Sequence, residues 1–328
     1  MAKAKVVLTD YVWEALDVEN EILGALAEIV PLQVTDPEAF FPEAEDCDAL
    51  LNTYGGPITA DVMARMPNCK IIARYGIGVD TIDLDAATEA GIIVTNNPTY
   101  CIEEVAEHTL AMLLTCARKI AFYDRLVRGG DWAVPPGKPM FRLAGATVGL
   151  IGFGNIARRV AKGAAGLDMR VLYSDPFVEP GQFDAPGEKV EFEALLRESD
   201  YLCVHAPLTA QTRGMLGADA FAQMKSTAFL VNCSRGPIID TDALVQALDD
   251  GQIAGCALDT TDPEPLPADH TLRARDNVIV NPHAAWYSEQ AMEGLQRGAP
   301  SEVRCVLKGE WPVNVVNRAV KDNNRAGL

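Results

Sequence analysis

The chain has 328 residues, of which 48% are hydrophobic, and it carries a formal net charge of −18. A strongly acidic chain repels phosphate backbones and anionic lipids, so we expect it to bind neither nucleic acid nor a membrane directly. Single hydrophobic cores seldom grow beyond roughly 250 residues, and this length therefore predicts two domains.

The amino terminus and the cysteines favour a reduced, cytoplasmic setting. Met1 to Lys5 lead straight into an apolar strand pattern, without the hydrophobic region and cleavage site of a secretion signal. The longest apolar helical stretch, 110–116, is far shorter than the roughly 20 residues that span a bilayer. The 8 cysteines are scattered without a Cys-x-x-Cys pair, so we expect free thiols and no metal site.

The first third of the chain alternates short apolar strands with helical patterns, which is typical of a parallel α/β domain. Strands are predicted at 6–10, 29–34, 49–54, 70–75 and 92–96, with helices at 11–26 and 59–66. A long amphipathic helix is predicted over 102–128. The Pro- and Gly-rich segment 134–139 that follows is predicted to be a loop or a connector between domains.

A second α/β series follows this connector. Its predicted strands lie at 147–151, 170–174, 201–205, 228–232, 254–258 and 278–281. This set suits a dinucleotide-binding fold, in which ligands lie beyond the carboxyl ends of the strands. The last helical stretch, about 288–308, is too short to be a domain and must pack on one of the two domains.

A glycine-rich turn between the strand at 147–151 and a helix indicates a dinucleotide site. Gly152, Gly154 and Ala157 form a Gly-x-Gly-x-x-Ala pattern whose backbone N–H groups can hold a pyrophosphate. The motif alone also fits an ordinary tight turn, but Asp175 ends the next strand where the fold requires an acidic residue. A carboxylate there binds both ribose hydroxyls and repels a 2′-phosphate. We therefore expect NAD, with NADP disfavoured by Asp175.

Polar residues near the ends of later strands supply an acid–base catalyst and an anion clamp. Reduction of a 2-oxo acid needs a hydride donor, a proton for the forming alkoxide, and donors for the carboxylate. We expect protonated His283 to give the proton, Glu264 to orient it, and Arg235 to grip the carboxylate. Asp259 would bind the nicotinamide carboxamide. A plainer interpretation remains: Glu264 lies between prolines like an exposed loop carboxylate, and Arg235 fits a turn cap.

Other candidates carry weaker signals. His205 follows an apolar strand and is either a core histidine or a cofactor contact. Trp286 is either a core residue or a pocket wall, and Cys233 is expected to offer only backbone contacts. His108 is expected on a helix face or at a subunit contact, and His270 in a solvated loop.

Together these motifs resemble the D-isomer-specific 2-hydroxyacid dehydrogenase family over most of the chain. The segments that carry the resemblance are 74–80, 205–208, 231–236, 257–259 and 282–290. Within the family, 282–290 looks most like the C-terminal-binding protein group, which are NAD-sensing transcriptional corepressors, and their bacterial relatives. Thr260, Thr261 and Asp262 replace more usual residues, which bears on specificity and not on class.

The resemblance implies two doubly wound parallel-sheet domains. A flavodoxin-like substrate domain would comprise 1–99 and 288–328, with a Rossmann NAD-binding domain, 100–287, inserted in it. A homodimer is implied as well, through 102–128 and the arm at 131–145.

The resemblance also implies the roles of individual residues. Catalysis would rest on Arg235, Glu264 and His283. The residues expected to contact NAD are Gly152, Gly154, Asn155, Ile156, Asp175, His205, Pro207, Thr212, Cys233, Ser234, Arg235, Asp259 and His283. The residues expected to contact the substrate are Tyr54, Arg74, Gly76, Gly78, Arg235 and Trp286.

The sequence thus predicts an NAD-dependent dehydrogenase that interconverts a small 2-oxo acid and its D-2-hydroxy acid, similar to hydroxypyruvate or glyoxylate reductases. Two alternatives stay open: an NAD-gated scaffold resembling the corepressors, and a short form of phosphoglycerate dehydrogenase. The sequence leaves open which 2-hydroxy acid is used, in which direction, and whether the acidity reflects a saline habitat.

Overall fold

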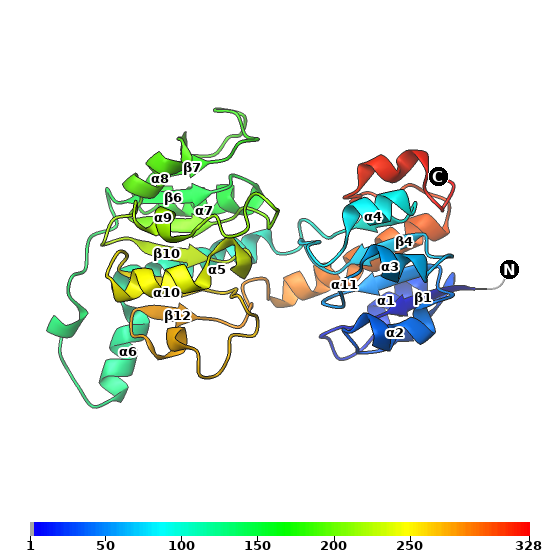
Figure 1. The fold of residues 1–328 in the computed structure, drawn as a ribbon, viewed down its shortest axis with the longest axis horizontal. Helices are drawn as coiled ribbons and strands as arrows, with labels where there is room; N and C mark the ends of the chain where they lie inside the picture. The colour runs from blue at the N-terminus through cyan, green and yellow to red at the C-terminus, as the bar shows by residue number, and fades with distance from the viewer. Residues whose placement is uncertain (1–2) are drawn as a thin grey trace. The chain divides into compact units, whose positions relative to one another are not determined.

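The computed structural model describes residues 3–328. The chain divides into two compact units, Met1–Cys101 with Ser288–Leu328, and Ile102–Tyr287. Each unit is built around one parallel sheet (Figure 1). Among the described residues, none of the helices combines the length and the apolar character needed to cross a membrane.

The first unit contains a five-stranded sheet in the order β2-β1-β3-β4-β5. Its strands are β1 (Ala4–Leu8), β2 (Ala27–Pro31), β3 (Ala49–Asn52), β4 (Ile71–Arg74) and β5 (Ile93–Thr95). Every residue of β3, β4 and β5 is buried, as expected for parallel strands covered on both faces. The strand order is that of flavodoxin-like folds, which confirms the predicted fold class.

Helices cover this sheet on both faces. They are α1 (Asp17–Leu23), α2 (Pro37–Ala44), α3 (Ala60–Ala64), α4 (Leu84–Glu89) and α11 (Glu289–Leu307), with the 3₁₀ turn η4 (Arg318–Asp322) near the carboxyl end. Phe40 of α2, Met63 of α3 and Ala87 of α4 share one core with the sheet. Helices α1 and α11 pack on each other, and α11 also contacts β3 and β4. The last long helix therefore belongs with the first unit.

The second unit contains a seven-stranded sheet in the order β12-β11-β10-β9-β6-β7-β8. Its strands are β6 (Thr147–Ile151), β7 (Arg170–Ser174), β8 (Glu188–Lys189), β9 (Tyr201–Val204), β10 (Phe229–Asn232), β11 (Gly255–Leu258) and β12 (Val278–Val280). The order runs outward from β6 in both directions, as in the Rossmann fold. The edge strand β8 has only two residues, too few to give a periodic pattern in the sequence.

The helices of this unit are α5 (Ile102–Arg118), α6 (Ile120–Arg128), α7 (Asn155–Ala165), α8 (Phe192–Glu198), α9 (Ala218–Phe221) and α10 (Thr241–Asp249), with 3₁₀ turns η1 (Pro135–Gly137), η2 (Gly236–Ile238) and η3 (Thr271–Ala274). All the helices except α6 form a layer on each face of the sheet. Residues of α8, α9 and α10 share one core with the sheet, and residues of α5 and α7 share another.

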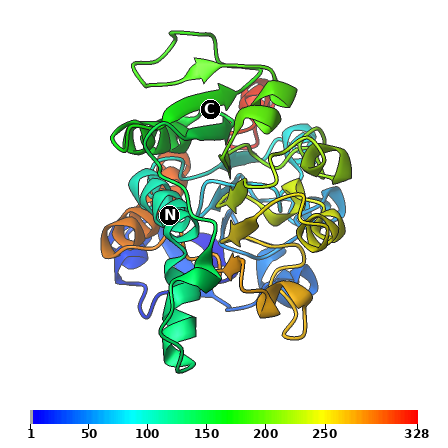
Figure 2. The ribbon, with the colours of Figure 1, turned by 90° about the vertical axis from the view of Figure 1, so that its left-hand side faces the viewer.

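The prediction of a single long helix over 102–128 is wrong, because the structure has two helices there. Lys119 has a left-handed φ of 52°, which divides the stretch into α5 and α6. α5 buries one face in the core, whereas α6 has no buried residue. The helix is interrupted where the chain leaves the sheet, and in Figures 1 and 2 α6 extends away from the sheet.

Candidate active site

Five candidate positions follow the carboxyl ends of strands in the second unit. Asp175 follows β7, His205 follows β9, Arg235 lies just beyond β10, Asp259 follows β11, and His283 lies beyond β12. Because all these strands are parallel, their carboxyl ends meet at one edge of the sheet. The fold therefore gathers the polar residues that the sequence pattern singled out.

The glycine-rich turn between β6 and α7 has the geometry of a phosphate site. Gly152 has a φ of +87°, and a Cβ there would lie 3.1 Å from the amide of Ala206, so the turn requires glycine. Gly154 precedes α7, and a Cβ there would meet no protein atom within 4 Å. Packing does not explain that second glycine, whereas close approach of a pyrophosphate to the helix N-terminus does.

The Asp175 carboxylate is tied to this turn. Its Oδ2 accepts a hydrogen bond from the Phe153 amide at 2.8 Å, and its Oδ1 accepts one from the Phe177 amide at 2.8 Å. Both bonds fix the carboxylate beside the glycine-rich turn and leave lone pairs on each oxygen. The position fits the recognition of ribose hydroxyls.

His205 carries a neutral ring with an unused nitrogen. Burial lowers the pKa of His205 to about 4, and its Nε2 atom is buried without a hydrogen-bond partner in the part of the chain that the structure describes. Buried polar atoms are normally paired, so an orphan at a ligand-binding edge fits a contact with a bound group. This observation favours the cofactor contact over the core-histidine interpretation.

Neighbouring predicted cofactor residues are fixed by local hydrogen bonds. The Thr212 hydroxyl donates to the Pro207 carbonyl at 2.6 Å, and the Ser234 hydroxyl donates to the Ala206 carbonyl at 2.6 Å. Burial raises the pKa of the Cys233 thiol to about 12, so this side chain stays protonated at neutral pH. Cys233 therefore has the character of a packing residue.

His283 and Glu264 form a short hydrogen-bonded pair. Nδ1 of His283 lies 2.6 Å from Oε1 of Glu264. Burial acts to raise the pKa of Glu264, but His283, through its hydrogen bond and its charge, the Thr261 backbone and Arg235 together lower that pKa below its ordinary value. An ionised carboxylate on Nδ1 orients the ring and leaves Nε2 for an exchangeable proton.

Arg235 lies close to the same pair. Its positive charge also lowers the pKa of Glu264, and its Nη1 donates to the Ser234 carbonyl at 2.9 Å. A Cβ on Gly236 would lie 2.0 Å from the Thr261 carbonyl oxygen, so only glycine lets the start of η2 pack against the segment that leads to Glu264. That contact keeps the guanidinium near the acid–base pair.

The loop that carries His283 is held by Asp259. The His283 amide donates to the Asp259 carbonyl at 2.8 Å, and the amides of Ala284 and Ala285 each donate to one of its carboxylate oxygens at 2.9 Å. Asp259 is only 1% exposed. These bonds support the left-handed φ of 55° at His283. A nicotinamide contact for Asp259 stays a prediction, beside this structural role.

His108, expected on a helix face or at a subunit contact, lies at this edge of the sheet. Its Nε2 is 3.6 Å from Oδ1 of Asp259 and 3.5 Å from Nδ2 of Asn281. Helical spacing could have shown that His108 lies on the inner face of α5. His108 stands three residues after Val105 and four before Met112, both buried on the inner face of α5.

The predicted substrate residues divide between the two units. In the first, Arg74 ends β4 and donates to the Tyr75 carbonyl, and its guanidinium lies 5.7 Å from the Tyr54 ring centroid. Gly76 has a φ of +143°. In the second unit, Trp286 contacts the Tyr287 ring edge-on. All of the predicted substrate residues stay predictions as substrate contacts.

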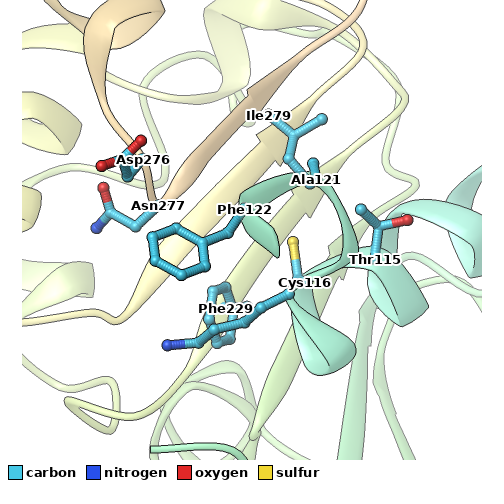
Figure 3. Close-up of a pocket in the computed structure, with 9 residues that line it drawn as sticks. Thr115, Cys116, Ala121, Phe122, Phe229, Asp276, Asn277 and Ile279 are labelled. Carbon is cyan, nitrogen blue, oxygen red and sulfur yellow. The ribbon is translucent and has the colours of Figure 1, made fainter. Parts of the chain in front are cut away.

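A cavity of about 110 Å³ lies elsewhere in the second unit (Figure 3). Its lining includes Cys116 of α5, Phe122 of α6 and Phe229 at the amino end of β10. Because it adjoins the amino ends of the strands, it is on the opposite edge of the sheet from His283. The cavity therefore lies apart from the groups predicted to be catalytic.

Comparisons with known proteins agree with this geometry. Residues 110–285 match the NAD binding domain of the D-isomer specific 2-hydroxyacid dehydrogenases. The chain is 40% identical over 281 residues to a glyoxylate reductase of Korarchaeum cryptofilum, covering 84% of each chain. It is 36% identical over 299 residues to a D-3-phosphoglycerate dehydrogenase of Methanocaldococcus jannaschii, covering 90% of this chain and 57% of the relative.

A solved structure extends the likeness to nearly the whole chain. D-lactate dehydrogenase from Aquifex aeolicus, complexed with NAD and lactic acid, superposes with a TM-score of 0.85 at 28% identity, over 98% of this chain and 99% of the other. Fold, cofactor turn and sequence agree. The chain belongs to the D-isomer specific 2-hydroxyacid dehydrogenase family and is an NAD-dependent oxidoreductase.

Proposed function

We propose that the protein reduces a small 2-oxo acid to its D-2-hydroxy acid with NADH, and that glyoxylate is a substrate. The observation that carries this proposal is the 2.6 Å pair of His283 and Glu264, with Arg235 beside it, at the edge that holds the glycine-rich turn. Similarity to glyoxylate reductases supports the choice of substrate.

The proton would come from His283. When bound, NADH supplies the hydride. An imidazolium donates its Nε2 proton to the oxygen that becomes negative, and ionised Glu264 on Nδ1 stabilises the protonated ring. In the reverse direction the neutral ring takes the proton from the hydroxyl group.

The substrate carboxylate needs local positive charge in a chain with a net charge of −18. Arg235 provides a planar guanidinium near the acid–base pair, which suits a carboxylate and an adjacent carbonyl oxygen. The family resemblance further implies the backbone around Arg74, Gly76 and Gly78, together with Tyr54 and Trp286, as substrate contacts.

The cofactor preference is proposed from the carboxylate of Asp175. Its place beside the glycine-rich turn suits two ribose hydroxyls, and its negative charge repels a 2′-phosphate. NADH would therefore be used in preference to NADPH.

Two alternative functions make different predictions. Phosphoglycerate dehydrogenase activity is favoured by one relative of that name, of which this chain covers 57%. A corepressor-like scaffold is favoured only by the resemblance of 282–290, since the similar proteins named above are enzymes. A phosphoglycerate dehydrogenase would reduce 3-phosphohydroxypyruvate far better than glyoxylate, and a scaffold would bind NADH with negligible turnover.

The deciding experiment measures NADH oxidation by the purified protein with glyoxylate, hydroxypyruvate, 4-methylthio-2-oxobutyrate and 3-phosphohydroxypyruvate. We expect turnover with at least one of the three unphosphorylated acids, and a D product on chiral analysis where the product has a stereocentre. If the protein binds NADH but oxidises it with none of the four acids, the proposal is overturned.

We also propose that the protein is a homodimer. Helix α6 has no buried residue within one chain, and the arm that follows exposes Trp132 by 88% together with Val134 and Phe141. Apolar surface of this extent marks a contact with a partner, and a second copy of the chain suits it. Light scattering after size exclusion would give twice the monomer mass; a monomer at all concentrations would contradict the proposal.

A further inference from the structure

A buried carboxylate organises the carboxyl edge of the five-stranded sheet. Asp10 follows β1 and is 5% exposed. Its Oδ2 accepts from the Tyr54 amide at 2.7 Å, and its Oδ1 accepts from the amides of Thr53 at 3.2 Å and Gly55 at 3.0 Å. The Thr9 hydroxyl adds a fourth bond at 2.7 Å. One carboxylate thus holds three consecutive backbone N–H groups.

Further contacts bind the same segment, residues 53–55, to the sheet. The Thr53 hydroxyl donates to the Asp10 carbonyl at 2.7 Å, and the Asn52 side chain donates to the Gly55 carbonyl at 2.6 Å. A Cβ on Gly55 would lie 2.9 Å from the Thr9 hydroxyl oxygen and 3.2 Å from Oδ1 of Asp10. The 53–55 segment is therefore seated directly on the carboxylate.

The path of this segment fixes a side chain that the proposed function uses. Tyr54 is 44% exposed, and its ring lies 5.7 Å from the Arg74 guanidinium. The two residues come from neighbouring strands, since β3 pairs with β4 and Asn52 is in register with Arg74. The backbone anchor of Tyr54 therefore contributes to where its ring lies relative to Arg74.

We propose that Asp10 is a positioning residue that sets substrate selectivity by holding Tyr54 beside Arg74. The inference rests on the proposed function, because it assigns to Tyr54 the wall of the substrate pocket. Because we assign the Tyr54 ring to the wall of that pocket, a shift of the ring would change which substrate side chains the pocket accepts. Asp10 itself lies beneath the segment and acts through it.

The chemistry of the carboxylate makes asparagine an informative replacement. Four donors approach two oxygens in the wild-type protein. In Asp10→Asn one oxygen becomes an NH₂ group, so in either amide orientation at least one N–H group of the 53–55 segment faces another donor. An unpaired buried donor is costly, and the segment must shift to find water.

The test combines kinetics with hydrogen exchange on the full chain. For Asp10→Asn we expect the KM for glyoxylate to rise by about tenfold, while kcat changes by less than about threefold and the Kd for NADH is unchanged. Selectivity for glyoxylate over 4-methylthio-2-oxobutyrate should fall. The amides of residues 53–55 should exchange faster than in the wild type.

Two further variants make the result specific. Asp48→Asn is the matched control, because Asp48 accepts from the Lys5 amide and from Lys70 at the opposite, amino edge of the same sheet; its KM should equal that of the wild type. Thr53→Val removes the hydrogen bond from the Thr53 hydroxyl to the Asp10 carbonyl and keeps the Asp10 carboxylate. It therefore tests the positioning role even if Asp10→Asn does not fold. We expect a rise in KM of about threefold.

Faster exchange at 53–55 with unchanged KM and selectivity would overturn the inference, and so would unchanged exchange. Failure of the proposed function is recognised separately, from the wild-type protein alone. If the wild-type protein oxidises NADH with none of the 2-oxo acids tested, the selectivity claim fails together with the proposed function.

Discussion

The carboxyl edges of the two sheets are organised in different ways. In the second unit two side chains pair with each other, His283 with Glu264, while Asp259 holds backbone N–H groups of the loop that carries His283. In the first unit, one side chain, Asp10, holds backbone N–H groups and presents a tyrosine. We infer that the side-chain pair in the second unit moves protons and that the Asp10 arrangement in the first unit selects substrates. Variants at the two edges should therefore change different kinetic constants.

The largest effect is expected from His283→Ala. Without a proton donor, kcat should fall by about 10³-fold, while the Kd for NADH changes little. Stopped-flow measurement of NADH oxidation together with a fluorescence titration of NADH checks both values. His270→Ala, which removes the histidine that caps η3 in the same unit, is the control. A kcat within threefold of the wild type would remove His283 from the mechanism.

A smaller loss is expected from Glu264→Gln. The amide keeps a hydrogen bond to His283 but loses the charge that stabilises an imidazolium, so kcat should fall by about 10²-fold. The low pKa of Glu264 means that the wild-type carboxylate stays ionised down to mildly acidic pH. The pH dependence of wild-type kcat should therefore show no loss from protonation of Glu264 at any pH above the ordinary pKa of a glutamate. Glu293→Gln, at an exposed ion pair on α11, should behave as the wild type.

The cofactor part of the comparison is tested by Asp175→Asn. Removal of the charge should reduce the preference for NADH over NADPH by about tenfold, measured as the ratio of kcat/KM for the two cofactors. Asp184→Asn, in the loop after β7, controls for a general change of charge. An unchanged ratio would show that another group excludes the 2′-phosphate.

The smallest effect concerns stability. Burial lowers the pKa of His205 from 6.5 to about 4, so between these values the unfolded chain binds a proton that the folded chain does not. Stability should fall as the pH drops through this window, by up to about 3 kcal/mol from this residue. Chemical denaturation at pH 7 and pH 4.5 should show a smaller loss for His205→Gln than for the wild type. Equal losses would contradict the assignment.

The sequence was most informative where a pattern is local. Strands at 147–151 and 170–174 match β6 and β7 to the residue, because both are short apolar runs bounded by turn residues. The strand predicted at 49–54 ends early, at Asn52, because the amides of residues 53–55 bond to Asp10 instead of a neighbouring strand. Such a competition between distant groups has no signature in a local pattern.

The site was predicted unevenly for the same reason. His283 and Glu264 were proposed as partners by chemistry, and they lie within hydrogen-bond distance. His108 was not expected at the site and Asp10 was not singled out, because their partners depend on which helix and which loop fold over the sheet ends. The break at Lys119 escaped prediction because the amphipathic pattern continues through it, although α6 leaves the core.

The most direct test of the account compares two variants in one set of initial-rate curves with glyoxylate at saturating NADH. His283→Ala should lose kcat by about 10³-fold with KM nearly unchanged, and Asp10→Asn should raise KM by about tenfold with kcat nearly unchanged. Loss of kcat in both variants, or no effect on kcat in His283→Ala, would contradict the division between a catalytic edge and a substrate-selecting edge.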